Sequence, residues 1–148
     1  MRQRHTSNFD VIDYIHQQLH AYNIQNLGED FYPVVTPHDP FLHAIAAYDD
    51  QNQLCGGLVY KLRDQGNTFF VEFFFLKNSS RQQGSGSRLI AAAKEWAAEL
   101  HCQKIRLCTH TFQAHKFYLK MGFQEASVTP CPIAKCPENC HYTLEFIL

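Results

Sequence analysis

The sequence has no apolar run approaching the roughly 20 residues that a membrane-spanning helix needs. Its basic start, residues 1–8, is not followed by the apolar segment of a secretory signal. It also lacks a charge excess, since 13 Lys and Arg stand against 14 Asp and Glu in 148 residues. Phosphate neutralisation needs a basic surplus, so this balance argues against a protein that coats nucleic acid. We therefore expect a cytoplasmic protein with no membrane partner and no nucleic-acid partner.

Proline is scarce and unevenly placed. All six prolines lie in two clusters, residues 33–40 and 130–137, and none lies between residues 41 and 129. Regular structure can therefore run through that middle stretch. The chain is 45% hydrophobic and shows no internal repeat and no low-complexity linker. It is predicted to be one domain over residues 1–148, long enough to bury a core.

Six cysteines would indicate three disulfides in a small secreted chain, but without an export signal we expect reduced thiols. Three of them are predicted to be plain buried thiols: Cys55, Cys102 and Cys108. The other three lie beside His141 near the C-terminus: Cys131, Cys136 and Cys140. That group could hold a tetrahedral zinc ion or form a Pro-braced loop with free thiols. We favour the loop because the spacing is uncommon, and neighbours in a strand point to opposite faces.

The first helix is predicted from apolar residues that recur at three- and four-residue spacing between Ile12 and Tyr22. Ser7 and Asp10 stand just before it, close to a capping-box pattern. His16 and His20 lie one turn apart on its other face. Such a pair can bind metal, but we expect a solvated face because no third ligand is evident.

The rest of the chain is predicted to alternate strands and helices. Strands are predicted over residues 41–48, 54–63, 69–76, 105–109, 123–128 and 141–148, and helices over 87–100 and 112–121. Gly56-Gly57 indicates a bulge or a close backbone approach. The stretch 69–76 is apolar on both faces, so it should be central and covered on both sides. Thr111 should cap the last helix and Gly122 should end it. This order predicts a mixed α/β domain.

The segment most informative about chemistry lies between the central strand and the Ala-rich helix. It reads Arg81-Gln82-Gln83-Gly84-Ser85-Gly86-Ser87. A turn here presents backbone N–H groups at a helix N-terminus, which is a ready anion site. Gly84 and Gly86 carry no Cβ that would keep a phosphate away, and Arg81 adds a positive charge. The loop is not a Walker A motif, and Leu89 stands where a dinucleotide fingerprint needs a third glycine.

The loop does match the pattern Arg/Gln-x-x-Gly-x-Gly/Ala, and it is followed by Phe117-Tyr118-Leu119-Lys120-Met121-Gly122-Phe123. With these motifs in this order, the chain resembles the GNAT superfamily of N-acetyltransferases, most strongly from Phe69 to Phe123. The resemblance implies a mixed, mostly antiparallel sheet that splays between its fourth and fifth strands and is flanked by helices. It also implies acetyl-CoA as the acyl donor.

The resemblance further implies where acetyl-CoA binds. The pyrophosphate would lie over the backbone of residues 82–87, and the pantetheine arm would pair with the strand edge at Phe74–Leu76. The thioester would sit in the gap beside Ile105–Thr109. Thr111 stands where many relatives have Asn. The residues expected at the cofactor are Phe74, Phe75, Leu76, Arg81, Gln82, Gln83, Gly84, Ser85, Gly86, Ser87, Thr111, Gln113, Phe117 and Lys120.

Amine attack on a thioester requires a group that takes a proton and one that protonates the leaving thiolate. Tyr118 matches the position that is often this acid in the family; the alternative is a packed core aromatic. Glu72 is the candidate base, because it is the one charged residue in the apolar stretch 69–76 and burying an unpaired carboxylate is costly. Its alternative, slightly favoured, is an ion pair with Lys61 or Arg63.

The expected activity is acetyl transfer from acetyl-CoA to a primary amine by direct attack. No acyl-enzyme is expected, because no cysteine falls at the motif positions that the thioester should meet. The acceptor stays open between a small-molecule amine and a protein or peptide amine. The rival interpretations are a non-catalytic acyl-CoA-binding sensor and a metal-binding regulatory domain. Exchange or pairing of the final strand would give a homodimer, although nothing in the sequence demands one.

Overall fold

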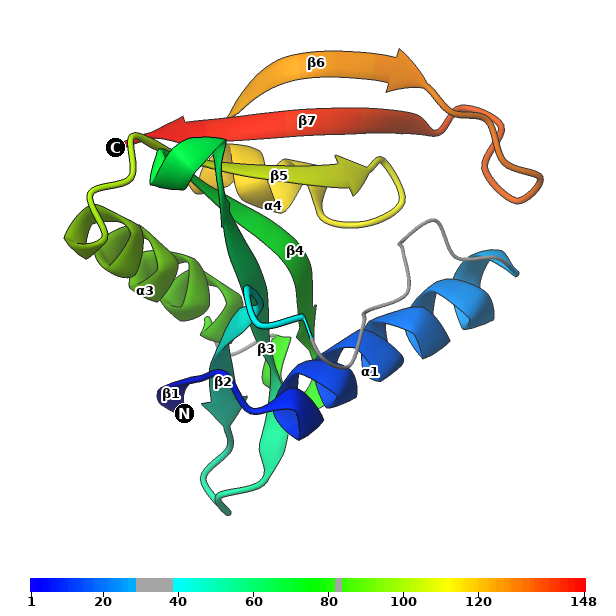
Figure 1. The fold of residues 1–148 in the computed structure, drawn as a ribbon. Coiled ribbons are helices and arrows are strands. Elements are labelled where there is room, and N and C mark those ends of the chain that lie inside the picture. Colours follow the sequence, from blue (N-terminus) through cyan, green and yellow to red (C-terminus); the bar gives the residue numbers. More distant parts are fainter. Residues whose placement is uncertain (29–38, 82–83) are drawn as a thin grey trace.

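The computed structural model describes residues 1–28, 39–81 and 84–148. A seven-stranded sheet in the order β1-β2-β3-β4-β5-β7-β6 runs through the molecule (Figure 1). Its strands are β1 (Arg2–Thr6), β2 (His43–Tyr48), β3 (Leu54–Arg63), β4 (Thr68–Leu76), β5 (Lys104–His110), β6 (Gln124–Pro130) and β7 (Cys140–Ile147). The helices are α1 (Phe9–Leu27), α2 (Asn78–Arg81), α3 (Ser85–Glu99) and α4 (His115–Lys120), with a 3-10 turn η1 (Asp64–Gly66). None of these helices is long and apolar enough to cross a bilayer.

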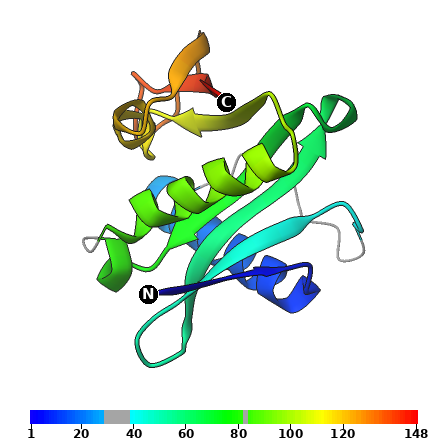
Figure 2. The same cartoon turned by 90° about the vertical axis from the view of Figure 1, so that its left-hand side faces the viewer.

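Two hydrophobic clusters lie on opposite faces of the sheet. Helix α3 covers one face of β2–β4 and α1 covers the other (Figure 2). On the α3 side, Leu89 packs in one cluster with Phe69, which is 0% exposed. On the α1 side, Ile15 and Phe73 share the second cluster. The central strand, β4, is therefore covered on both faces, as its apolar sequence predicted.

The strands β4 and β5 form the one parallel pair of the described sheet; its other neighbours are antiparallel. Their ladder begins at Thr68 opposite Lys104 and ends at Val71 opposite Leu107. Both strands continue beyond that point, β4 to Leu76 and β5 to His110, without pairing to each other. The predicted splay between the fourth and fifth strands, numbered along the sheet, is confirmed.

Glycines allow β3 to approach its neighbours closely. A Cβ built on Gly56 would overlap the carbonyl oxygen of Phe75 and lie 2.9 Å from the Cα of Leu76. A Cβ on Gly57 would lie 2.6 Å from the carbonyl oxygen of Ile45. The predicted close backbone approach at Gly56-Gly57 is confirmed, and the β2–β3 register shifts beside it, between Ala47 and Tyr48.

The start of α1 differs from the sequence prediction. The N-cap is Asn8, whose Oδ1 accepts from the backbone N–H groups of Asp10 at 2.8 Å and Val11 at 3.4 Å. The Ser7–Asp10 capping box is therefore wrong by one position; the Ser7 hydroxyl lies 3.1 Å from Nδ1 of His43 instead. Asn serves as well as Ser at an N-cap, so sequence alone could not decide between them.

Two predicted side-chain environments are also wrong. His16 is not solvated: it is 6% exposed and its ring packs edge-on against Phe73, 4.9 Å between centroids. Thr111 does not cap the last helix, because α4 begins at His115 without a side-chain cap. The Thr111 hydroxyl accepts from the backbone N–H of Cys140 at 3.0 Å, so it ties this turn to β7. The helix does end before Gly122, whose φ is +95°, as predicted.

Candidate active site

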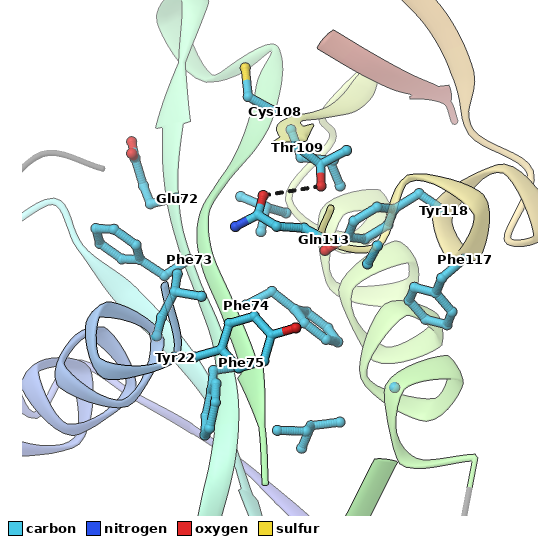
Figure 3. A pocket seen from close by; sticks show the side chains of 16 residues that line it. Tyr22, Glu72, Phe73, Phe74, Phe75, Cys108, Thr109, Gln113, Phe117 and Tyr118 are labelled. Atoms are coloured by element: carbon cyan, nitrogen blue, oxygen red, sulfur yellow. Dashed lines mark hydrogen bonds between the residues drawn. The ribbon is translucent and has the colours of Figure 1, made fainter. Parts of the chain in front are cut away.

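A cavity of about 290 Å³ lies where β4 and β5 separate (Figure 3). Its walls come from β4, from the second half of β5, from the N-terminus of α3, from α4 and from α1. The lining residues are Leu19, Tyr22, Val71, Glu72, Phe73, Phe74, Phe75, Leu76, Gly86, Leu107, Cys108, Thr109, Gln113, Ala114, Phe117 and Tyr118. Five separate elements thus meet around an aromatic-lined space at the gap between the two diverging strands.

Tyr118 enters this cavity from α4. Its side chain is 5% exposed, and its ring stands edge-on to Phe74, 6.2 Å between centroids and 78° between planes. A second edge-on contact with Phe123, at 5.7 Å, holds the ring from the other side. Two aromatic neighbours therefore orient the phenol toward the gap, where it can meet a group bound between the strands.

Glu72 lies at the opposite end of the cavity, and its carboxylate points away from Tyr118 (Figure 3). Its Oε1 is 2.6 Å from a guanidinium nitrogen of Arg63, which in turn lies over the ring of Phe70 at 3.9 Å. Lys61 pairs instead with Asp39, at 3.3 Å. Of the two ion pairs considered from the sequence, the structure forms the one with Arg63. The carboxylate still lines the cavity and is 13% exposed.

Six of the expected cofactor residues come together in the cavity: Phe74, Phe75, Leu76, Gly86, Gln113 and Phe117. Gly84 is the N-cap of α3 with a left-handed φ of +73°. A Cβ on Gly86 would lie 3.2 Å from Cζ of Phe117, so even a methyl group here would press on the Phe117 ring. Both glycines thus have a structural reason to be glycine where the chain should approach a phosphate-bearing ligand.

Other expected cofactor residues lie elsewhere. Gln82 and Gln83 fall outside the described residues, as does the side chain of Arg81. Ser85, at 1% exposure, is buried at the start of α3, whereas Ser87 and Lys120 are exposed. These three and Thr111 do not line the cavity.

Eight lining residues are not among the site residues expected from the sequence: Leu19, Tyr22, Val71, Phe73, Leu107, Cys108, Thr109 and Ala114. Tyr22 was recognised only as part of an apolar helix face. Cys108 was expected to be buried, but it is half-buried and lines the cavity at the Glu72 end, with Sγ 3.7 Å from Oγ1 of Thr143 (Figure 3). No sequence pattern identifies these residues, because their place in the cavity depends on where β4 and β5 separate in the fold.

His110, at the end of β5, is a buried neutral imidazole beside the cavity. It is 4% exposed, and burial together with the neighbouring His141 lowers its pKa to about 4. The amide nitrogen of Asn139 donates both to Nδ1 of His110 and to the carbonyl of Cys131, each at 2.9 Å. Nδ1 is therefore an acceptor, and Nε2 carries the proton. This contact holds the β6–β7 loop against β5.

The cysteine-rich loop that His110 holds contains free thiols. All six cysteines are unpaired, and Cys55 and Cys102 are buried as predicted, whereas Cys131, Cys136 and Cys140 are half-buried. Within residues 1–28, 39–81 and 84–148, no group of three or more His, Cys, Asp and Glu side chains is placed to hold a metal ion.

Comparison with known proteins gives consistent matches. A family model described as "Acetyltransferase (GNAT) family" matches residues 10–123. The chain is 32% identical to blasticidin-S acetyltransferase of Streptomyces morookaense over 99 residues, which are 66% of this chain and 71% of that protein. It is 29% identical to the protein YdhI of Bacillus subtilis (strain 168) over 96 residues. That second match covers 64% of this chain and 58% of the relative, less than two thirds of its length.

Solved structures share the fold. An aminoglycoside 6'-N-acetyltransferase complexed with coenzyme A has a TM-score of 0.73 at 16% identity, covering 99% of this chain and 97% of that one. A spermidine N-acetyltransferase from Vibrio cholerae has a TM-score of 0.71 at 16% identity, covering 99% and 95%. The splayed sheet, the glycine-bearing start of α3 and the family model that spans most of the sequence agree: the chain belongs to the GNAT family of acetyltransferases.

Proposed function

We propose that the protein transfers an acetyl group from acetyl-CoA to the primary amine of a small molecule bound between β4 and β5. The observation that carries this proposal is the cavity itself, which opens where the β4–β5 ladder ends and is lined by Tyr118 and Gly86. The related blasticidin-S acetyltransferase is named for a small-molecule acceptor, and so are the aminoglycoside and spermidine enzymes of the same fold.

Acetyl-CoA would enter from the α3 end of the cavity. The start of α3 offers backbone N–H groups and the positive end of its dipole to the pyrophosphate. The pantetheine arm would follow β4 past Phe74, and the thioester would reach the gap beside Tyr118. The cytoplasmic location expected from the sequence suits this donor.

The reaction is a single displacement. The amine nitrogen attacks the thioester carbonyl, a C–N bond forms, and the C–S bond breaks. The proton lost by the amine goes to solvent water or to the Glu72 carboxylate, which keeps its ion pair with Arg63, and the leaving thiolate takes a proton from the Tyr118 hydroxyl. Glu72 and Tyr118 lie at opposite ends of the cavity, which suits one group on the acceptor side and one on the leaving-group side.

A CoA-release assay across an amine panel tests this function. The panel contains a polyamine, an aminoglycoside, a blasticidin-type nucleoside, free amino acids and a peptide with a free N-terminus. We expect turnover with at least one small-molecule amine and none above background with the peptide. Turnover with the peptide alone would mean that the acceptor is a peptide amine and not a small-molecule amine. CoA binding without turnover on any amine would favour the sensor alternative.

The role of Tyr118 is tested by Tyr118→Phe. We expect kcat to fall by about 100-fold, the usual contribution of a positioned acid, while the Kd for CoA measured by calorimetry stays the same. Tyr48→Phe, on β2 away from the cavity, is the matched control and should leave kcat unchanged. An unchanged kcat in Tyr118→Phe would reject the acid role.

Direct attack without an acyl-enzyme is tested by mass spectrometry. Protein mixed with acetyl-CoA alone should show no added acetyl group. Because Cys108 lines the cavity, it is the residue on which a covalent intermediate would be sought. An acetyl group trapped on Cys108 that an amine then removes would overturn the direct mechanism.

A further inference from the structure

The two walls of the cavity belong to parts of the fold that the sheet does not join at this level. One wall carries Tyr22 of α1, which packs on β2–β4. The other carries Thr109 and Gln113, at the end of β5 and in the turn after it. The β4–β5 ladder has already ended at Val71, so the distance between these walls must be set by something other than strand pairing.

A hydrogen bond between two side-chain amides spans the walls. Nε2 of Gln113 donates to Oδ1 of Asn23 on α1, at 3.4 Å. The other end of the Gln113 amide is held too, because Oε1 accepts from the backbone N–H of His110 at 3.1 Å and from the Thr109 hydroxyl at 3.4 Å. Gln113 is therefore anchored on β5 and reaches across to α1. We call the Asn23–Gln113 hydrogen bond the clasp.

Burial makes the clasp more than a surface contact. Asn23 is 0% exposed, so its amide has exchanged water for protein partners. Removing one partner of a buried hydrogen bond costs more than the bond itself contributes, because the remaining group has already lost its contact with water. Asn23 also directly follows Tyr22, so holding Asn23 in place holds the adjacent cavity wall.

Asn23 itself does not line the cavity, whereas Tyr22 does. Any effect of Asn23 on a bound molecule must therefore pass through the position of α1. A residue of this kind positions a binding surface without touching the substrate.

We propose that Asn23 and Gln113 are positioning residues that fix the width of the acceptor end of the cavity. The clasp holds the Tyr22 wall of α1 at a set distance from β5, so an acceptor amine is presented to the thioester in one place. This inference rests on the proposed acetyl transfer. It also gives Gln113 a role different from the cofactor contact that the family resemblance implied.

The test uses Asn23→Leu, which removes the acceptor oxygen and keeps a branched side chain of four heavy atoms. We expect the KM for the acceptor amine to rise about tenfold, with kcat changing less and the Kd for CoA staying within twofold. Gln25→Leu, an amide-to-leucine substitution two residues later at an exposed position of α1, should change none of these values.

A double-mutant comparison identifies the partner. If the clasp acts as a unit, the double variant Asn23→Leu/Gln113→Leu should raise the acceptor KM no further than Gln113→Leu alone. Additive effects would overturn the clasp. A loss of CoA affinity in Asn23→Leu that matches the loss of acceptor affinity would also overturn it, since α1 would then position the cofactor instead.

Hydrogen exchange separates this inference from the proposed function. Backbone amides at the C-terminal end of α1 should exchange faster in Asn23→Leu than in Gln25→Leu, whether or not any amine is acetylated. Equal exchange rates would reject the clasp even in an active enzyme. A wild-type protein that acetylates no amine would reject the proposed function and the kinetic role together, while exchange still reported whether the clasp anchors α1.

Discussion

At the scale of single residues, one missing side chain decides how closely α3 and α4 approach. A Cβ on Gly86 would lie 3.2 Å from Phe117 and 3.7 Å from Phe74. Alanine is favoured over glycine in a helix by up to about 1 kcal/mol, so Gly86→Ala should not lower the Tm. The added methyl should instead push Phe117 toward the cavity and weaken CoA binding, measured by calorimetry.

Ala91→Gly is the control for this prediction, because Ala91 is exposed on the same helix. It should lower the Tm without changing the Kd for CoA. A Gly86→Ala protein that binds CoA as tightly as the wild type would show that Phe117 moves aside without affecting the cofactor site.

His110 makes the fold sensitive to acid. The folded protein keeps this imidazole neutral down to a pKa of about 4, whereas an unfolded histidine takes up a proton near its ordinary pKa of 6.5. Between these values the unfolded chain binds more protons, so stability falls as the pH drops. His110 does not change the free energy of unfolding above pH 7, and it lowers that free energy by about 2–3 kcal/mol at pH 4.5.

Urea unfolding at pH 7.5, 6 and 4.5 measures this loss. His110→Gln should flatten the pH dependence, since the buried group no longer titrates. His20→Gln, on the exposed side of α1, should keep the wild-type slope. A wild-type slope in His110→Gln would mean that other groups dominate the acid response.

At the scale of elements, the β3–β4 pair depends on Gly56. A side chain there would overlap the backbone of Phe75 and approach the Cα of Leu76, and φ is +143°. Gly56→Ala should therefore destabilise the protein by about 3 kcal/mol or more in chemical unfolding. Gly66→Ala, where φ is +88° but the space is open, should cost only about 1 kcal/mol. Equal losses would indicate that backbone conformation, not the close approach, sets the cost.

Most elements could be predicted because their apolar residues repeat with the period of the element. The central strand is apolar on both faces and is buried on both faces. The strand β1 was missed because Arg2–Thr6 is polar and mostly exposed. It is a strand because its backbone pairs with β2, from Arg2 opposite Tyr48 to Thr6 opposite Ala44. A strand that is held by backbone pairing at a sheet edge need not alternate apolar and polar residues, so the sequence does not reveal it.

Only part of the cavity lining could be predicted from the sequence. Glycines before a helix and the Phe117–Phe123 motif are local patterns, so the sequence contains them in full. Tyr22, Cys108 and Asn23 come from segments that look ordinary in the sequence. They matter because α1, which packs on β2–β4, comes close to the same cavity as the second half of β5. No local sequence pattern indicates that these segments lie close together in the fold.

At the scale of the whole molecule, the cavity joins both halves of the sheet, so a ligand bound in it should stabilise the entire fold. CoA at 100 times its Kd should add about 2.7 kcal/mol. For a domain of this size, that raises the Tm by roughly 8 °C in a thermal melt. Gly86→Ala should show a smaller shift at the same CoA concentration. No shift with CoA in the wild type would contradict the cofactor assignment.

The short β4–β5 ladder also has a consequence for how the chain folds. The pairs β2–β3, β3–β4 and β6–β7 join consecutive segments, whereas the β4–β5 ladder joins Thr68 to Lys104 across the whole of α3. Only four residue pairs are made there, from Thr68 to Val71, so this contact closes a long loop for few bonds. We expect the two antiparallel halves to form first and to dock late. In pulse-labelled hydrogen exchange, amides of β3 should gain protection before those of β5 at this ladder. The cavity would then form last, in the same step in which the two halves of the sheet dock.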